Sequence, residues 1–302
     1  MQDPTYTDLD RALAFAIPLR SARGRVVRLG PTLTRVLAAH DYPPAIERLL
    51  AEALTLVALI GSTLKDPQAQ LTMQTRGDDR IVQLLVCDYR GGEVRGYVQF
   101  DADRLAAAPV QPTLAELFGQ TYLAITFDLA ATGERYQGIV PLDGETLAEA
   151  VQSYFVQSEQ IPSLVRIGVD KHADGSTVAG GLFLQHLPEG EDGRERLHTR
   201  LDHPEWEHVA ALAQTVEAAE LASAQLPLEE LLWRLFNEDE VRLLGTTPLV
   251  RGCRCDGDYI RSVLTKFPAD ERHAMADADG MIKVDCAFCA QVFSVPAEMA
   301  EA

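Results

Sequence analysis

The strongest constraint on the fold is a group of four cysteines in the last fifty residues of this 302-residue chain. Cys253 and Cys255 form a Cys-x-Cys pair, and after 30 intervening residues Cys286 and Cys289 form a Cys-x-x-Cys pair. Close pairs of this kind supply two ligands from each of two turns, and Zn²⁺ accepts four thiolates in a tetrahedron. We therefore predict that these four residues bind one zinc ion per chain.

The residues around the second pair favour a metal site over a dithiol active site. Apolar residues within 281–284 and 292–295 flank the pair, which predicts a β-hairpin whose turn holds the ligands. A thioredoxin-like Cys-x-x-Cys would instead open a helix after a strand. A closed zinc site that only holds the tail together is the simpler alternative. The single residue between Cys253 and Cys255 weakens that alternative, because ordinary zinc ribbons have two to four.

The net charge argues against nucleic acid as a partner. The chain carries 45 Asp and Glu against 27 Lys and Arg, a formal net charge of -18, whereas binding to a phosphate backbone needs clustered basic residues. Residues 251–302 follow the same trend, with six Lys and Arg against nine Asp and Glu, which disfavours a zinc ribbon that binds DNA or RNA. We expect no nucleic-acid partner.

The sequence also predicts a compartment. The first four residues include Asp3 but no Lys or Arg, and no apolar run follows them as it would in a signal peptide. The most apolar stretch, residues 54–60, is far shorter than the roughly 20 residues of a membrane helix. We therefore expect a soluble, cytoplasmic protein without membrane association. Because cytoplasmic thiols stay reduced, clustered cysteines there more often bind metal or sense redox state than form structural disulfides.

Residues 1–190 are predicted to form one α+β core domain with an antiparallel sheet. Apolar positions that recur every three or four residues predict a helix over residues 43–64. Shorter helices are predicted after Thr113, where Glu116 completes a capping box, and over residues 147–155. A period of two predicts strands, several of them joined by tight turns, at residues 70–76, 81–89, 94–100, 122–129 and 181–187.

Residues 191–249 are predicted to form an acidic helical linker, and residues 250–302 a small zinc-binding domain. Residues 191–240 carry 13 Asp and Glu against four Arg, half of the chain's net charge in a sixth of its length. Apolar periodicity predicts two helices in this stretch, at residues 206–219 and 227–236. Solvated helix faces explain such a charge run simply. The alternative is a marginally stable linker that packs on a neighbouring part of the chain and can be released.

Several blocks of the sequence, taken together, match one known family. The cysteine segment contributes residues 252–255 (Gly-Cys-Arg-Cys), the 30-residue gap and residues 284–289 (Val-Asp-Cys-Ala-Phe-Cys). Three further blocks lie in the same order along the chain, at residues 153–162, 179–185 and 232–241. These blocks resemble those of the heat shock protein 33 family, the redox-regulated holdase chaperones. The resemblance spans most of the chain. This chain departs from the family pattern in two respects: its tail after Phe293 is short, and its N-terminal end is slightly longer.

The resemblance implies an ATP-independent holdase and not an enzyme. Reduced and zinc-bound, such a protein is inactive, whereas oxidised, zinc-free and dimeric it holds aggregation-prone client proteins. The resemblance further implies disulfides that join Cys253 with Cys255 and Cys286 with Cys289, the latter pair being oxidised first. A thiol–disulfide oxidoreductase is the alternative function, and turnover in insulin reduction would distinguish it from a holdase.

The chemistry of four cysteines on zinc accounts for such a switch. Thiolates on Zn²⁺ stay deprotonated and nucleophilic toward peroxide or hypochlorous acid, and one disulfide removes two ligands at once. A segment of about 50 residues cannot replace, with its own core, the roughly 10 to 16 kcal/mol that zinc contributes. We expect the tail to unfold and the linker that rests against it to be released. The apolar surface then offered to clients would include Trp206, Trp233 and Phe236.

Other reactive side chains are given structural roles. Cys87 falls at an apolar position of a predicted strand, which indicates a buried and inert thiol. The linker histidines, His198, His203 and His208, are expected to be exposed and not to bind metal. His273 has no vacancy to fill once four cysteines hold the ion. Residues 277–280 begin like a calcium loop but lack its remaining ligands, so they are interpreted as a turn.

Overall fold

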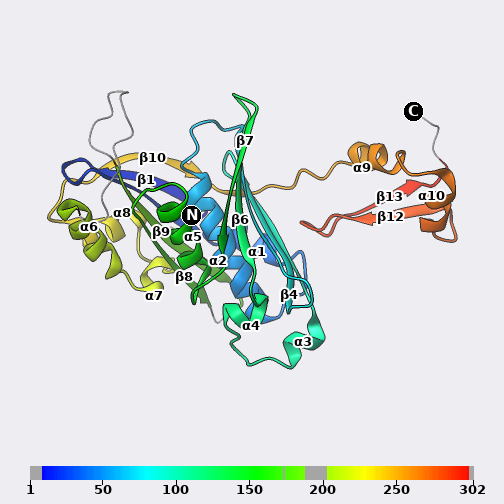
Figure 1. Ribbon diagram of the computed structural model, residues 1–302, viewed down its shortest axis with the longest axis horizontal. Helices are drawn as coiled ribbons and strands as arrows, with labels where there is room; N and C mark the ends of the chain where they lie inside the picture. The colour runs from blue at the N-terminus through cyan, green and yellow to red at the C-terminus, as the bar shows by residue number, and fades with distance from the viewer. Residues whose placement is uncertain (1–8, 173, 188–202, 299–302) are drawn as a thin grey trace, which may run out of the picture.

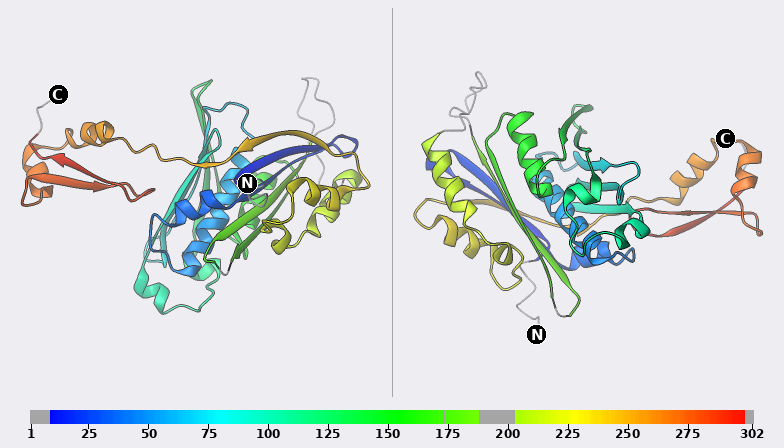
Figure 2. Two further views of the ribbon diagram at one scale, coloured as in Figure 1. Left: turned by 180° about the vertical axis from the view of Figure 1, so that it is seen from behind. Right: turned by 60° about the horizontal axis from the view of Figure 1, so that its bottom comes forward.

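The computed structural model describes residues 9–172, 174–187 and 203–298. These residues form two large β-sheets on either side of a long helix, three helices on the outer face of one sheet, and a small C-terminal part that projects from the body (Figure 1). Figure 2 shows that the C-terminal part is reached through an extended segment and that the tip of its hairpin points back toward the body. The arrangement confirms the predicted α+β fold class. None of the described helices is long and apolar enough to span a lipid bilayer.

The first sheet, sheet A, contains five antiparallel strands in the order β10-β1-β2-β9-β8. Its strands are β1 (Arg11–Ile17), β2 (Ala22–Leu29), β8 (Ser163–Lys171), β9 (Thr177–His186) and β10 (Arg242–Pro248). The strand predicted at residues 181–187 is confirmed as part of β9, which is buried along its whole length. β1, β2, β8 and β10 were not predicted. In β2 the reason is that three arginines interrupt the apolar alternation.

The second sheet, sheet B, contains six strands in the order β11-β5-β4-β3-β6-β7. Its strands are β3 (Gln70–Arg76), β4 (Val82–Arg90), β5 (Glu93–Phe100), β6 (Tyr122–Leu129), β7 (Glu134–Pro141) and β11 (Val250–Arg251). The strands predicted at β3, β4, β5 and β6 are confirmed. Gly91 and Gly92 make the β4–β5 turn at positive φ, 54° and 91°, which the tight reversal requires. β11 pairs in parallel with β5, so the C-terminal segment joins this sheet.

The helix predicted over residues 43–64 is confirmed as α2 (Pro44–Gly61), the central element of the core. It contacts β2, β8 and β9 of sheet A and β3, β4 and β5 of sheet B, and it is therefore apolar on most of its surface. Gly61 allows its end to pack on β4, because a Cβ there would lie 2.2 Å from Cγ of Tyr89. The other helices of this part are α1 (Pro31–Leu37), α3 (Ala102–Ala106), α4 (Leu114–Phe118), which has the predicted capping box, and α5 (Leu147–Gln157).

Three helices cover the face of sheet A opposite to α2: α6 (Pro204–Gln214), α7 (Ala218–Leu221) and α8 (Leu228–Phe236). They share a second apolar core with the sheet, in which the ring of Phe15 lies 6.0 Å from that of Phe236. Trp206 is buried there, whereas Trp233 is 65% exposed. The predicted helices are present, although the first one ends at Gln214. Among the described residues, this core includes none beyond Val241, so the helices pack on sheet A and not on the cysteine segment as we expected.

The C-terminal part contains α9 (Gly257–Leu264), α10 (Ala269–Met275) and a hairpin of β12 (Met281–Asp285) and β13 (Val292–Pro296). The hairpin predicted around the second cysteine pair is therefore present. The apolar core of this part is small, with four fully buried side chains: Leu264, Ile282, Val295 and Ala297. A core of this size supplies little of the stability that an independent domain needs.

Candidate metal centre

The first cysteine pair is positioned by strand pairing at the edge of sheet B. β11 pairs with β5, and directly after it the Gly252 N–H donates to the Val94 carbonyl over 3.0 Å. A Cβ at position 252 would lie 2.5 Å from the Cβ of Glu93, so this close approach requires glycine. The chain is thus fixed to the core at the residue before Cys253, and Cys255 follows two residues later.

The second cysteine pair lies in the turn between β12 and β13. The Cys286 N–H donates to the Gln291 carbonyl over 2.9 Å, and the Ala290 N–H donates to the Cys286 carbonyl over 2.8 Å. Ala290 adopts the left-handed conformation, with a φ of 57°, which lets the chain reverse within this short turn. The turn brings Cys286 and Cys289 together at the tip of the hairpin.

The two pairs meet, and their four sulfur atoms lie within 4.8 Å of one another. The Sγ atoms of Cys253 and Cys255 are 3.3 Å apart, those of Cys253 and Cys286 are 3.6 Å apart, and those of Cys255 and Cys289 are 3.5 Å apart. All four are free thiols. A tetrahedron of Zn–S bonds of about 2.3 Å has edges of about 3.8 Å, close to these spacings, whereas a disulfide needs about 2.05 Å.

The electrostatics of the cluster favour a bound cation. Burial raises the pKa of the Cys255 thiol, and hydrogen bonds with the Cys253 and Cys289 sulfurs raise it further. Sulfurs this close repel one another as thiolates, so all four become ionised together only around a cation that offsets their charge. The geometry and the soft sulfur donors together fit Zn²⁺.

The tip of the cysteine hairpin touches the core. The Arg95 guanidinium lies over the ring of Phe288 at 4.0 Å from its centre, and the ring of Tyr97 meets it edge to face at 5.0 Å. The His40 Nε2 and the Ala287 carbonyl are 2.8 Å apart. Sequence reasoning did not reveal these contacts. The sequence offered one signal for them. Phe288 is a large aromatic residue between Cys286 and Cys289, at the tip of a predicted turn where the hairpin has no core of its own for it to fill.

Two arginines tie the acidic helices to sheet A and its first turn. Arg11 of β1 forms a two-point ion pair with Glu229 of α8, with N–O distances of 2.8 and 2.6 Å, and this pairing lowers the pKa of Glu229. Arg20, in the 3₁₀ turn η2 (Pro18–Arg20), donates to Asp239 at 2.7 Å and to Glu205 of α6. The carboxylates of this acidic segment are therefore not all solvated, because some of them form ion pairs with Arg11 and Arg20.

A third arginine holds the loop after α7 from within the core. Arg28 of β2 is fully buried, and its guanidinium donates to the carbonyls of Leu221 at 3.0 Å, Glu220 at 3.1 Å and Leu226. Burial lowers the pKa of Arg28 to about 10. An arginine directly between Val27 and Leu29 was the sequence signal for such a contact, but its partners lie almost 200 residues away along the chain.

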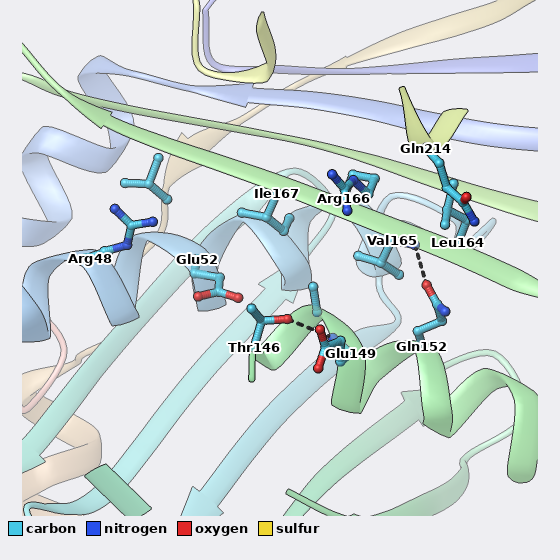
Figure 3. A pocket seen from close by; sticks show the side chains of 12 residues that line it. Arg48, Glu52, Thr146, Glu149, Gln152, Leu164, Val165, Arg166, Ile167 and Gln214 are labelled. Carbon is cyan, nitrogen blue, oxygen red and sulfur yellow. Dashed lines mark hydrogen bonds between the residues drawn. The ribbon is translucent and has the colours of Figure 1, made fainter. Parts of the chain in front are cut away.

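A cavity of about 550 Å³ lies between α2, α5 and β8 (Figure 3). Arg48 and Glu52 reach it from α2, and burial raises the pKa of Glu52. The Gln152 side chain accepts a hydrogen bond from the Val165 N–H of the edge strand, at 3.1 Å. The described residues that line the cavity include the acidic side chains of Glu52 and Glu149 and the basic side chains of Arg48 and Arg166.

The remaining side chains that the sequence singled out have structural roles. Cys87 is fully buried in β4, and burial raises the pKa of its thiol well above the usual value, in keeping with an inert cysteine. His208 pairs with Asp239 at 3.0 Å, whereas His198 lies outside the described residues. The His203 side chain accepts from the Glu205 N–H and caps α6.

Two predictions concern the segment between the cysteine pairs. The His273 ring lies 2.6 Å from the Ala269 carbonyl of its own helix, and it is not one of the groups of the cluster. The carboxylate of Asp277 accepts from the Asp279 and Met281 N–H groups and pairs with Lys283 at 2.8 Å, as a residue that shapes a turn does.

Comparison with known proteins gives one consistent result. A family model described as Hsp33 protein matches residues 10–296. The 33 kDa chaperonin of Caulobacter vibrioides is 40% identical over 293 residues, which is 95% of this chain and 94% of that protein. The 33 kDa chaperonin of Yersinia pestis is 36% identical over 281 residues, or 93% and 90% of the two chains. The crystal structure of the 33 kDa chaperonin from Thermotoga maritima has the same fold, with a TM-score of 0.77 and 21% identity over 95% of both chains.

Proposed function

Because this chain belongs to the Hsp33 family of 33 kDa chaperonins, we propose that it is a redox-regulated, ATP-independent holdase. In its reduced, metal-bound form the protein is inactive. Under oxidative and heat stress it is oxidised, binds unfolding proteins and prevents their aggregation. The observation that carries the proposal is the convergence of four free sulfurs, from two segments separated by 30 residues, within 4.8 Å.

Cys253, Cys255, Cys286 and Cys289 hold one zinc ion per chain in this proposal. Bound zinc would keep the four sulfurs deprotonated and would join the end of β11 to the turn of the C-terminal hairpin. The sulfur spacings of 3.3 to 3.6 Å support four-sulfur ligation. Four protein ligands leave no position for a substrate, which suits a regulatory site better than a catalytic one.

Oxidation converts each cysteine pair to a disulfide. Two thiolates give up two electrons and form one S–S bond, while peroxide takes these electrons and two protons and becomes two waters. The proposed pairs are Cys253 with Cys255 and Cys286 with Cys289, the latter first. This pairing rests on the family, because Cys253 Sγ lies at similar distances from Cys255 Sγ and Cys286 Sγ. Each disulfide withdraws two ligands, so the site no longer has four sulfur donors.

Loss of the cluster affects the linker because β11 and β10 connect the two segments. With four buried apolar side chains in the core of its described residues, the C-terminal part lacks the core to stay folded alone. Its unfolding frees the chain at Gly252, which weakens β11 on β5 and then β10 on β1. α8 directly precedes β10, so the helices on sheet A lose their anchor on that side.

Release of the helices exposes a broad apolar surface for clients. On sheet A it includes Leu13, Phe15 and Val26, and on the helices it includes Trp206 and Phe236, all buried in the reduced state. An extended apolar surface without deep pockets suits a chaperone, because unfolding proteins share exposed apolar side chains and no common shape.

The proposal divides the chain into three functional parts, a core at residues 1–190, a linker at residues 191–249 and a redox switch at residues 250–302. β10 and β11 are the strands through which the second and third parts join the sheets. The oxidised form is a homodimer, and the protein works in the cytoplasm, where thiols are kept reduced until stress.

The first test measures zinc content and the suppression of aggregation of a heat-unfolding client, before and after peroxide at elevated temperature and without ATP. We expect one zinc per chain before oxidation, and its loss as holdase activity appears. Cys286→Ser should bind zinc weakly, whereas Cys87→Ala, which removes the fifth cysteine, should behave as the wild type. Zinc that stays bound after peroxide, or leaves without gain of activity, contradicts the proposal. Insulin reduction with turnover would support the oxidoreductase instead.

A further inference from the structure

The turn between Cys286 and Cys289 rests on a prepared surface of sheet B. Arg95 and Tyr97 are alternate residues of β5, so both side chains project from the same face of the strand. They hold the half-buried ring of Phe288 from two sides, the guanidinium at 4.0 Å and the Tyr97 ring at 5.0 Å. Asp88 of β4 orients the guanidinium, with N–O distances of 2.6 and 2.8 Å.

Two arginines lie on this surface next to the sulfur cluster, with the carboxylates of Asp88 and Glu93 beside them. Arg254 lies between the two cysteines of the first pair and donates to Gln70, and it is close enough to Arg95 to feel its charge. Four thiolates around one divalent cation carry a net charge of -2. Two disulfides carry none, so oxidation makes the cluster neutral.

We propose that the Ala287–Phe288 tip is a latch that docks the cysteine cluster on the Arg95–Tyr97 surface and so slows the oxidative loss of its metal. This inference rests on the proposed zinc site and adds a second contact that holds it in place. The Cys253–Cys286 and Cys255–Cys289 sulfurs are 3.6 and 3.5 Å apart, so a bound metal would tie the hairpin to the first pair across the cluster. When those ties are broken, the contacts of the tip are what hold the hairpin on the core.

The latch predicts that a core residue without any contact to sulfur controls the chemistry of the cluster. An edge-to-face aromatic pair or a cation–π contact each changes a docking equilibrium by roughly threefold to tenfold. If peroxide reaches the sulfurs through the undocked form, Tyr97→Ala should release zinc about five times faster than the wild type. Tyr97 is only half-buried and faces away from α2, so this variant should keep the fold.

The experiment follows zinc release from the reduced, zinc-loaded full-length protein after peroxide, with a chromogenic chelator as the reporter. It compares Tyr97→Ala, Phe288→Ala, the double variant and Phe288→Tyr, which keeps the ring. Tyr136→Ala serves as the matched control, because Tyr136 stacks on Phe127 near the opposite edge of the same sheet.

The latch predicts that both single variants release zinc faster, that the double variant is no faster than the quicker single one, and that Phe288→Tyr and Tyr136→Ala match the wild type. Wild-type rates in Tyr97→Ala, or effects of the two substitutions that multiply, would overturn it. No client is present, so the result is independent of holdase activity. Failure to load zinc at the outset would instead contradict the proposed metal site.

Discussion

Replacing Arg28 by methionine is expected to loosen the helices from sheet A while the sheet itself stays folded. The Arg28 guanidinium is fully buried and donates to the carbonyls of Glu220, Leu221 and Leu226, at the end of α7 and in the loop that follows. Methionine has a long, flexible side chain that fills much of the same space but donates no hydrogen bond. The substitution therefore leaves buried carbonyls without this donor.

The magnitude follows from two opposing terms. Each buried carbonyl that loses its donor costs about 1 to 3 kcal/mol, so those of Leu221 and Leu226 cost about 2 to 6 kcal/mol together, whereas the Glu220 carbonyl keeps the Ser223 N–H as a donor. Burial lowers the pKa of Arg28 from 12.5 to about 10, which corresponds to roughly 3 kcal/mol for keeping the charge out of water. Methionine removes that second cost. The midpoint of the balance is a loss of about 1 kcal/mol of docking, or roughly fivefold more frequent opening of the helices.

Hydrogen exchange followed by mass spectrometry measures this opening in the reduced, zinc-loaded protein. Peptides that cover residues 218–228 should exchange faster in Arg28→Met, and the peroxide needed for holdase activity should fall. Arg25→Met is the matched control, because Arg25 lies on the opposite face of β2 and donates to the Ser62 carbonyl at 3.2 Å. Unchanged exchange in Arg28→Met, or an equal increase in Arg25→Met, would refute the reasoning.

Three further outcomes are expected. Although burial opposes it, hydrogen bonds from Arg20 and His208 hold the pKa of Asp239 below its usual range. This contact therefore stabilises the docked helices above about pH 4 and is lost as the pH falls through the lowered pKa of Asp239. Hydrogen exchange of the linker should accordingly become faster in acid, and the increase should be smaller in Asp239→Asn. Gly252→Ala should force β11 from β5 and lower zinc retention against a competing chelator, whereas retention equal to the wild type would contradict the close approach. Cys87→Ala should leave the peroxide dose for zinc release unchanged, and a shift in that dose would reveal a fifth redox thiol.

Features that depend on near neighbours in the sequence could be predicted. The meeting of the four cysteines follows from the spacing of their two pairs, and the turn that holds Cys286 and Cys289 follows from the apolar residues on either side of it. α2 has a continuous apolar periodicity, and its ends deviate from the prediction by only one residue at the start and three at the end. In each case the information lies within about 40 residues of continuous sequence.

Features that depend on distant contacts could not be predicted. β1 pairs with β10 more than 200 residues later, and nothing in either segment identifies the other. The acidic helices were expected to rest on the cysteine segment because that segment follows them in the chain. They pack instead on sheet A, where Arg11, Arg20 and Arg28 bind them. The contacts of Phe288 could not be predicted either, because its partners, Arg95 and Tyr97, belong to β5, almost 200 residues earlier in the chain.

The positions of β10 and β11 bear on how the protein recovers after stress. Each is the outermost strand of its sheet, so both can peel away without disturbing the order β1-β2-β9-β8 or β5-β4-β3-β6-β7. The strands that remain would keep their order and register. In the proposed switch, recovery would require only that β10 and β11 pair again with the exposed edges of β1 and β5, without any change in the order of the other strands.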